Sequence, residues 1–251
     1  MTWRVIHKSV KGTSHRDCQD SCLVKSISKS DNLNYLICIA SDGAGSALNG
    51  KQGAEIACKS AILEIEKTLD QTTVFTQDIV MKWVENIRQA ILLKADEEKQ
   101  PVRDYACTLI GTVIGNDCSV FFQKGDGAIV TFKGTKTLNG RIIFWPASGL
   151  YPNMTYFITD EDIYNKLYIS IQTEYFDDIS IFTDGLQSLA LDFKTRTAYI
   201  PFFESMINIL RNQSVNELDI LENKLTIFLE SPQVNERTDD DKTFILATRY
   251  Q

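Results

Sequence analysis

The sequence predicts an α+β protein built as a four-layer αββα sandwich, in which two central, mostly antiparallel sheets are flanked by helix pairs. Three observations predict this fold. Two helical patterns follow an N-terminal hairpin pattern, many short strand patterns come next, and two further helical patterns precede a final strand. Short strands at close spacing favour antiparallel pairing over parallel crossovers. No linker or repeat divides the chain, so we expect residues 1–251 to form a single domain.

The N-terminal part of the chain contains three strand patterns. Residues 3–10 are expected to form a strand, and a polar loop over residues 12–20 leads into a second strand over residues 21–28. A turn at residues 31–32 connects it to an apolar run over residues 35–40, so the last two strands form a hairpin. An apolar run of this length bounded by glycine is typical of a buried strand.

Four segments have helical periodicity. After Gly50 the apolar residues recur at intervals of three and four, which predicts two consecutive helices that cover one sheet face. The second helix ends at the polar run 96–100 and Pro101. Residues 201–210 and 215–229 are expected to form the other helix pair. The apolar positions of the first pair are Ala54, Cys58, Ala61, Ile62, Ile65 and Leu69, then Ile79, Val80, Trp83, Val84, Ile87 and Ile91.

The remaining segments are rich in short strand patterns. Strands are predicted over residues 106–114, 118–123, 128–132, 179–183 and 239–250, and weaker strand patterns cover residues 154–158 and 167–171. Residues 134–153 are rich in loop-forming residues and match no regular element.

Composition excludes several classes of protein. The net charge of −7 argues against a general nucleic-acid or anionic-membrane binder. No apolar run approaches the roughly 20 residues of a membrane span, and residues 1–10 lack the apolar core of a signal peptide. The six cysteines form no Cys-x-x-Cys pair and only two histidines accompany them, so a structural zinc site is not expected. We therefore expect reduced thiols in a cytoplasmic protein.

Aspartates recur at the ends of predicted strands. Asp42 follows the apolar run 35–40, Asp126 lies between two glycines after residues 118–123, and Asp184 follows residues 179–183. Three consecutive aspartates, 239–241, precede the final apolar run. A single Asp-Gly pair indicates only a turn. Several such aspartates can meet only at one edge of a two-sheet sandwich, where their carboxylates would bind hard cations.

These aspartates lie in an ordered set of short motifs. The set contains Cys18-Gln19-Asp20, Ser41-Asp42-Gly43-Ala44-Gly45, Ala106-Cys107-Thr108-Leu109, Gly125-Asp126-Gly127, Phe182-Thr183-Asp184-Gly185-Leu186 and Asp240-Asp241-Lys242-Thr243. In this order and spacing the motifs resemble those of the type 2C metal-dependent Ser/Thr protein phosphatases (the PPM family), in particular its bacterial branch. The fold of that family is the same αββα sandwich.

The resemblance implies a metal-dependent phosphatase. Its cofactors would be Mn²⁺ or Mg²⁺, with two ions and a third, weaker one in some members. Asp42 would bridge two metals, the Gly43 carbonyl would bind one of them, Asp184 and Asp240 would hold the other, and Asp126 matches the position for the third. Such ions prefer oxygen ligands and lower the pKa of a shared water, so that a metal-bridging hydroxide attacks phosphorus.

The chain departs from the family pattern at several positions. Gln19 stands where a glutamate is usual, so either one metal binds more weakly or Asp20 takes over its role. His15 stands where animal members have a phosphate-gripping arginine, and the adjacent Arg16 could substitute for it. Ala44 replaces the histidine that is thought to protonate the leaving group in those members, so His15 is a hypothetical replacement, because imidazole titrates near neutral pH.

Two further features of the same motifs leave alternatives open. Asp241 replaces the usual asparagine after Asp240, so it would either strengthen cation binding or be solvated. Cys18 and Cys22 flank the first motif, where oxidation could disturb the metals as a redox switch.

The predicted function is metal-dependent hydrolysis of phosphoserine and phosphothreonine in proteins, in signalling. A phosphorylated protein, either a Ser/Thr kinase or its target, is the partner that the resemblance implies, with no nucleic acid and no membrane. Gln19 and Ala44 favour the alternative of a pseudophosphatase, catalytically weak or inactive, that acts as a protein-binding module. A hydrolase for a small phosphorylated molecule is a third possibility.

Overall fold

The computed structural model describes residues 2–29, 33–134, 137–147 and 155–250, and these ranges form two five-stranded sheets. The first sheet has the order β1 (Thr2–Val10), β12 (Lys242–Tyr250), β9 (Asp178–Phe182), β6 (Ala128–Lys133) and β7 (Asn139–Ile142). The second sheet has the order β2 (Ser21–Ser28), β3 (Asn34–Ser41), β4 (Leu109–Ile114), β5 (Ser119–Lys124) and β8 (Tyr168–Gln172). All neighbouring strands in both sheets are antiparallel.

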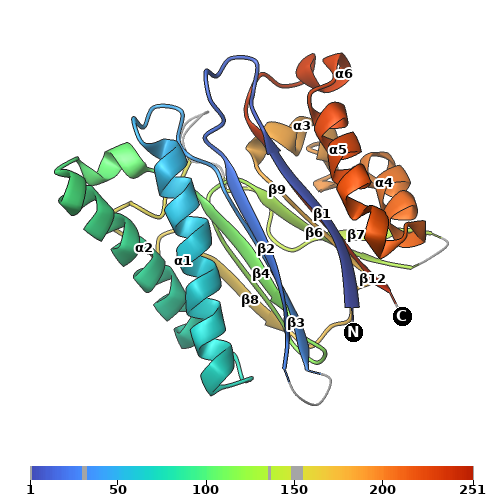
Figure 1. Cartoon of the computed structure of the whole chain (residues 1–251), viewed down its shortest axis with the longest axis horizontal. Coiled ribbons are helices and arrows are strands. Elements are labelled where there is room, and N and C mark those ends of the chain that lie inside the picture. Colours follow the sequence, from blue (N-terminus) through green and yellow to red (C-terminus); the bar gives the residue numbers. More distant parts are fainter. Residues whose placement is uncertain (1, 30–32, 135–136, 148–154, 251) are drawn as a thin grey trace.

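Helices cover the outer faces of the two sheets (Figure 1). On the second sheet lie α1 (Gly50–Gln71) and α2 (Gln77–Glu98). On the first sheet lie α4 (Ile200–Asn212) and α5 (Leu218–Leu229). The short elements are η1 (Val102–Tyr105), η2 (Asp184–Leu186), α3 (Gln187–Ala190), β10 (Leu191–Asp192), β11 (Thr197–Ala198), η3 (Val215–Glu217) and α6 (Pro232–Asn235).

Three apolar layers hold these elements together. The alternation of side chains along β3 explains why the strand is apolar from Tyr35 to Ala40, because both of its faces are buried. Leu36 faces the first sheet, where it joins a layer with Ile181 and Ile245, whereas Ile37 and Ile39 face the helices. A third layer, rich in phenylalanine, lies between the first sheet and α4 and α5.

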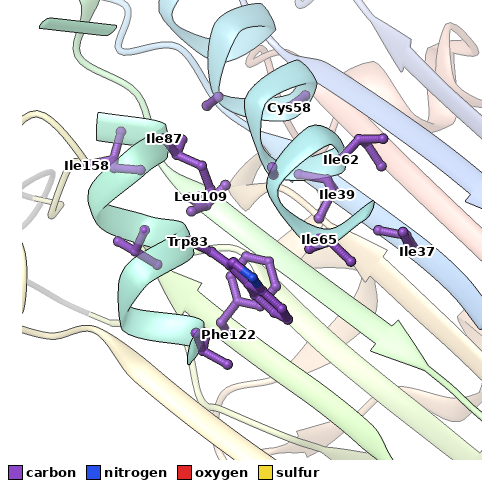
Figure 2. Packing of buried hydrophobic residues seen from close by; sticks show 14 of the residues in the cluster. Ile37, Ile39, Cys58, Ile62, Ile65, Trp83, Ile87, Leu109, Phe122 and Ile158 are labelled. Carbon is purple, nitrogen blue, oxygen red and sulfur yellow. The ribbon is translucent and has the colours of Figure 1, made fainter. Parts of the chain in front are cut away.

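Figure 2 shows the layer between the second sheet and its helices. Cys58, Ile62 and Ile65 of α1 and Trp83 and Ile87 of α2 point toward the sheet. The Trp83 indole is 2% exposed, and its Nε1–H donates a hydrogen bond to Thr68 Oγ1 at 2.7 Å. The apolar stripe at helical spacing is therefore core, as the periodicity predicts.

The predicted four-layer fold is confirmed, and so are both helix pairs and the N-terminal hairpin. Some of the predicted strand and helix boundaries were wrong. Strand β4 begins at Leu109 rather than at residue 106, because Cys107 makes only an isolated bridge to Gly43. The final strand begins at Lys242, so the aspartates at 239–241 precede it as a loop. Residues 215–229 contain a short 3-10 turn before α5 rather than one continuous helix.

The region between β6 and β9 differs most from the prediction. Strand β7 lies within residues 134–153, where no regular element was expected. Residues 155–158 form no strand, and the Ile158 amide instead donates to the Cys107 carbonyl at 2.9 Å. Residue 154 and the expected turn at 31–32 lie outside the described residues. Within the described ranges, no helix has the length and hydropathy needed to cross a membrane.

Candidate active site

Three aspartates from separate parts of the chain meet at one edge of the sandwich. Asp42 follows β3 of the second sheet, Asp184 follows β9 of the first, and Asp126 lies in the turn between β5 and β6. One carboxylate oxygen from each lies within 4.8 Å of the others. This edge is at the top of Figure 1, at the end of the molecule opposite the two termini. The expected convergence of these three aspartates is therefore present in the structure.

The environment of this cluster opposes negative charge. Burial, and then the charges of Asp20, Asp184 and Asp126, raise the pKa of Asp42 well above its ordinary value. Burial and the neighbouring charges of Asp126 and Asp240 raise the pKa of Asp184 in the same way. Like charges in a poorly solvated site favour protonation. A bound cation would reverse this preference, because it attracts the ionised forms.

Asp20 lies beside this cluster and is held by two threonines of the first-sheet side. It belongs to the β1–β2 loop (residues 11–20), and burial raises its pKa to about 7. The hydroxyls of Thr183 and Thr243 donate to its Oδ2 at 2.8 and 2.7 Å. Its Oδ1 is buried with no N–H or hydroxyl donor in reach among the described residues, and its carboxyl lies within hydrogen-bonding reach of the Asp42 carboxyl. An unpartnered buried oxygen of this kind fits a metal ligand.

Close backbone approaches explain the glycines after two of the aspartates. A Cβ on Gly43 would lie 2.4 Å from the Gly50 carbonyl carbon, and one on Gly185 would lie 1.9 Å from the Asp241 oxygen. The Asp42 carbonyl accepts a hydrogen bond from the Thr108 amide, and the Ala44 amide donates one to the Ala106 carbonyl. Because backbone groups alternate in direction along an extended chain, the Gly43 carbonyl points away from residues 106–108.

The two aspartates before β12 have different environments. The Asp240 side chain is 42% exposed and lies within electrostatic reach of Asp126 and Asp184. Asp241 is 2% exposed, which excludes the alternative that it is solvated. Its Oδ1 accepts a hydrogen bond from the backbone N–H of Gly12 and its Oδ2 accepts one from the backbone N–H of Gln19, both at 2.7 Å. Asp241 therefore anchors both ends of the β1–β2 loop rather than facing a cation.

The β1–β2 loop brings His15, Arg16 and Gln19 to a cleft of about 670 Å³. His15 Nδ1 lies 3.1 Å from Asp241 Oδ2, and its Nε2 lies 3.7 Å from Asp240 Oδ1. The side-chain amide of Gln19 donates a hydrogen bond from Nε2 to the Ala47 carbonyl at 3.4 Å. Arg16 is exposed in the same cleft. All three residues thus lie near the carboxylate cluster, although none is among its three most closely grouped aspartates.

Comparisons with known proteins identify the family. A model described as protein phosphatase 2C matches residues 11–230. Serine/threonine-protein phosphatase 3 of Escherichia coli (strain K12) is 36% identical over 252 residues, which cover 98% of each chain. This chain belongs to the protein phosphatase 2C family. The family predicted from the motif order is therefore confirmed.

Solved structures have the same fold. A bacterial serine phosphatase matches with a TM-score of 0.64 at 13% identity and covers 98% of both chains. Stp1 from Staphylococcus aureus matches with a TM-score of 0.61 at 12% identity, over 100% of this chain and 96% of that one. RsbX in complex with magnesium matches with a TM-score of 0.56 at 17% identity, over 98% of this chain and 94% of that one. At these identities the likeness concerns the fold alone.

The carboxylate cluster fits the divalent cations on which this family depends. Hard cations such as Mg²⁺ and Mn²⁺ prefer oxygen ligands. The cluster offers three carboxylate oxygens within 4.8 Å of one another, and burial and mutual repulsion raise the pKa values of Asp42 and Asp184, which a cation would lower. The chemistry of this donor set therefore matches the metal dependence of protein phosphatase 2C enzymes.

The thiols near the site are poorly suited to a redox switch. Burial raises the pKa of Cys18 to about 12 and that of Cys22 to about 11. The thiolate is the reactive form of cysteine, so these protonated thiols react slowly at neutral pH. All six cysteines are free thiols.

Sequence analysis missed how residues 155–167 are held beside the site. Lys124, at the end of β5, is fully buried, and its Nζ donates to the Asn165 carbonyl at 2.8 Å and lies 3.6 Å from Asp160 Oδ2. Phe157 of this segment packs on Ala44 and its neighbours after β3. The signal in the sequence was Lys124 itself, a lysine at the end of an apolar strand and directly before Gly125-Asp126-Gly127, where a buried charge needs partners.

The raised pKa values predict how stability responds to pH and metal. An acid whose pKa is higher in the folded state than in the unfolded state stabilises the fold at low pH, and this contribution is lost as pH rises through the folded pKa. For Asp20 that range runs from its ordinary 3.8 to about 7, and Asp42 and Asp184 shift in the same direction. Without divalent cations, we expect the protein to be less stable at about pH 8 than at about pH 5.

Thermal unfolding of metal-free protein, with and without added Mn²⁺, tests this expectation. Mn²⁺ should raise Tm at both pH values, and by about 5 °C or more extra at the higher pH, because fewer protons then compete for the carboxylates. The Asp219→Ala variant, which changes an exposed aspartate of α5, should respond as the wild type does. Equal Mn²⁺-induced shifts at both pH values would contradict the assignment of these groups.

Proposed function

We propose that this protein is a metal-dependent protein phosphatase that hydrolyses phosphoserine and phosphothreonine monoesters. The observation that carries this proposal is the half-buried cluster of Asp42, Asp126 and Asp184 at the edge of a protein phosphatase 2C fold. The Escherichia coli relative, which is named a serine/threonine-protein phosphatase, supports the same substrate class. We further propose that residues 1–251 form one phosphatase domain.

The proposed metal ligands combine the carboxylate cluster with the positions that the family motifs imply. Asp42 would be a ligand of two ions, with the Gly43 carbonyl as a ligand of one of them and Asp184 and Asp240 as ligands of the other. Asp126 lies close enough to Asp42 and Asp184 to support a further ion. Asp20 would take the place of the usual glutamate, because its carboxyl adjoins that of Asp42 and its Oδ1 accepts from no N–H or hydroxyl among the described residues. Gln19 offers only a neutral oxygen, and its amide donates to the chain after β3.

Mn²⁺ or Mg²⁺ is the proposed cofactor, and the magnesium complex of the related RsbX fold supports magnesium. When bound, such ions lower the pKa of coordinated water and offset charge on phosphoryl oxygens. The chain itself would hold the ions through Asp42 and Asp184, which follow strands of different sheets. It also brings His15 and Arg16 to the adjoining cleft, where they can contact the substrate phosphoryl group.

His15 is the proposed donor to the substrate. Ala44 leaves the position after Asp42-Gly43 without a hydrogen-bonding side chain. Nδ1 lies closer to a carboxylate, at 3.1 Å from Asp241 Oδ2, than Nε2 does, at 3.7 Å from Asp240 Oδ1, so we propose Nε2 as the nitrogen that would contact the phosphoryl group or the leaving oxygen. Arg16 would bind the phosphoryl oxygens from the same loop.

The cellular setting is also a proposal. Six free thiols are consistent with a reducing compartment, so we propose that the protein acts in the cytoplasm. Its partner is a phosphorylated Ser/Thr kinase or the target of one, in a signalling pathway. The net charge of −7 remains an argument against nucleic acid as a partner.

Removal of one proposed ligand tests the mechanism. We expect Asp184→Ala to lower Mn²⁺-dependent kcat on a phosphothreonine peptide and on para-nitrophenyl phosphate by at least about 10³-fold, because the lost ligand supported several kcal/mol of charge stabilisation. Steady-state kinetics in saturating Mn²⁺ measure this loss. Asp219→Ala is the matched control, with unchanged turnover expected.

Two outcomes of these assays would contradict the proposal. Folded wild-type protein that is inactive with every divalent cation would favour the binding-module alternative. Turnover of small phosphate esters without turnover of the phosphopeptide would favour a small-molecule hydrolase.

Replacement of the cleft histidine tests its role. We expect His15→Ala to lower kcat on the phosphothreonine peptide by about 10²-fold, in the range of a lost proton donor. The loss on para-nitrophenyl phosphate should be smaller, because nitrophenolate leaves without a proton. His7→Ala is the control, since His7 lies on β1 beside Glu222 at 2.9 Å, away from the cleft. Unchanged kinetics and an unchanged pH profile for His15→Ala would refute this role.

A further inference from the structure

We propose that Lys51 is a specificity-determining residue that binds an acidic side chain flanking the phosphorylated residue of the substrate. The inference rests on the proposed phosphatase function and deepens it by naming a substrate class. Its basis is the placement of an unpaired lysine in the cleft that adjoins the carboxylate cluster.

The cleft is large enough for a stretch of peptide. Its volume of about 670 Å³ exceeds the lower end of the range for ligand sites, about 300 Å³. His15, Arg16 and Gln19 line the side formed by the β1–β2 loop, and Leu48 and Lys51 line the side formed by the start of α1. Leu48 is 82% exposed, which leaves an apolar contact beside the Lys51 ammonium. Asp17 is the acidic residue of the lining.

Lys51 differs from the other lysines of the helix layer. Lys59 and Lys67 of α1 and Lys82 and Lys94 of α2 each form an ion pair with a glutamate on their own helix. Lys51 makes no ion pair or hydrogen bond with the described residues, although Glu55 is four residues away. Glu55 instead pairs with Lys59 at 3.3 Å. The lysine in the cleft is therefore the one whose charge is left for another molecule.

The position of Lys51 in α1 is unfavourable for the helix itself. It lies in the first turn, where the helix dipole disfavours a cation. This turn contains no acidic residue, and Asn49 provides no side-chain cap. An anionic side chain bound here would pair with Lys51 and would also interact favourably with the dipole. The local sequence thus suits an anionic partner better than it suits an isolated helix.

The loop after β3 also borders a more acidic region through Ser46. A second depression, of about 520 Å³, is lined by Asp104, Asp160 and Glu161, with Arg103 as its cation. Phe157 and Ala106 of this depression pack together beside Ala44. A substrate that extended from the cleft into this depression would meet positive charge in the first and mainly negative charge in the second. We expect an acidic residue to be favoured on one side only.

Peptide binding tests this inference separately from catalysis. Wild-type protein in Mn²⁺ would be titrated with labelled peptides that carry a non-hydrolysable phosphonate analogue of phosphothreonine. One peptide has glutamates before the analogue, a second has them after it, and a third has glutamines at all these positions. We expect one glutamate peptide to bind about three- to tenfold more tightly than the glutamine peptide, with the difference shrinking in high salt.

Charge reversal assigns the effect to Lys51. Lys51→Glu should remove or invert this preference, while the glutamine peptide changes in Kd by less than about twofold. Lys59→Glu, with the same charge change on the same helix, should retain the wild-type preference. Equal loss of affinity for all three peptides in Lys51→Glu would mean that Lys51 binds the phosphoryl group, and no change would mean that it binds neither. Either result overturns the inference.

The two hypotheses fail in distinguishable ways. A wild-type protein that binds the favoured peptide through Lys51 but hydrolyses no phosphopeptide would refute the proposed function alone. Normal hydrolysis with no difference in Kd among the three peptides would refute the role of Lys51 alone.

Discussion

The structure depends on holding mutually repelling carboxylates together in a poorly solvated place. Asp42 and Asp184 come from different sheets, so packing of the sandwich itself brings their charges together. Desolvation and mutual repulsion both raise their pKa values. Such an arrangement opposes folding unless protons or cations neutralise it. Metal binding and the stability of the sheet interface are therefore thermodynamically linked at this edge.

Several other features make sense as supports for this arrangement. The hydroxyls of Thr183 and Thr243, from the first sheet, bind Asp20 at the entrance to the second, so a hydrogen-bond bridge crosses the interface where the charges meet. Asp241 fixes the β1–β2 loop through backbone amides and thereby positions His15. Buried Lys124 ties the 155–167 segment to the end of β5. Rigid supports of this kind position groups that touch a substrate.

The sequence predicted the features that depend on local pattern. The apolar run before Asp42 and the helical spacing around Trp83 each follow from short-range periodicity, and the order of the aspartates predicted their convergence. The role of Asp241 was not predictable in this way, because its partner amide at Gly12 is 229 residues away and the contact exists only after both sheets form. Strand β7 has four residues and no buried face, so it lacks an apolar alternation to recognise.

The central claim is that divalent cations neutralise the carboxylates gathered between the two sheets. Anomalous X-ray scattering from crystals grown with Mn²⁺ tests it most directly, because the signal locates manganese without reference to activity. We expect anomalous peaks in contact with Asp42 and Asp184, with Asp20 still bound to its two threonines. Crystals with no manganese peak in this cluster, or with these carboxylates turned apart into solvent, would contradict the account.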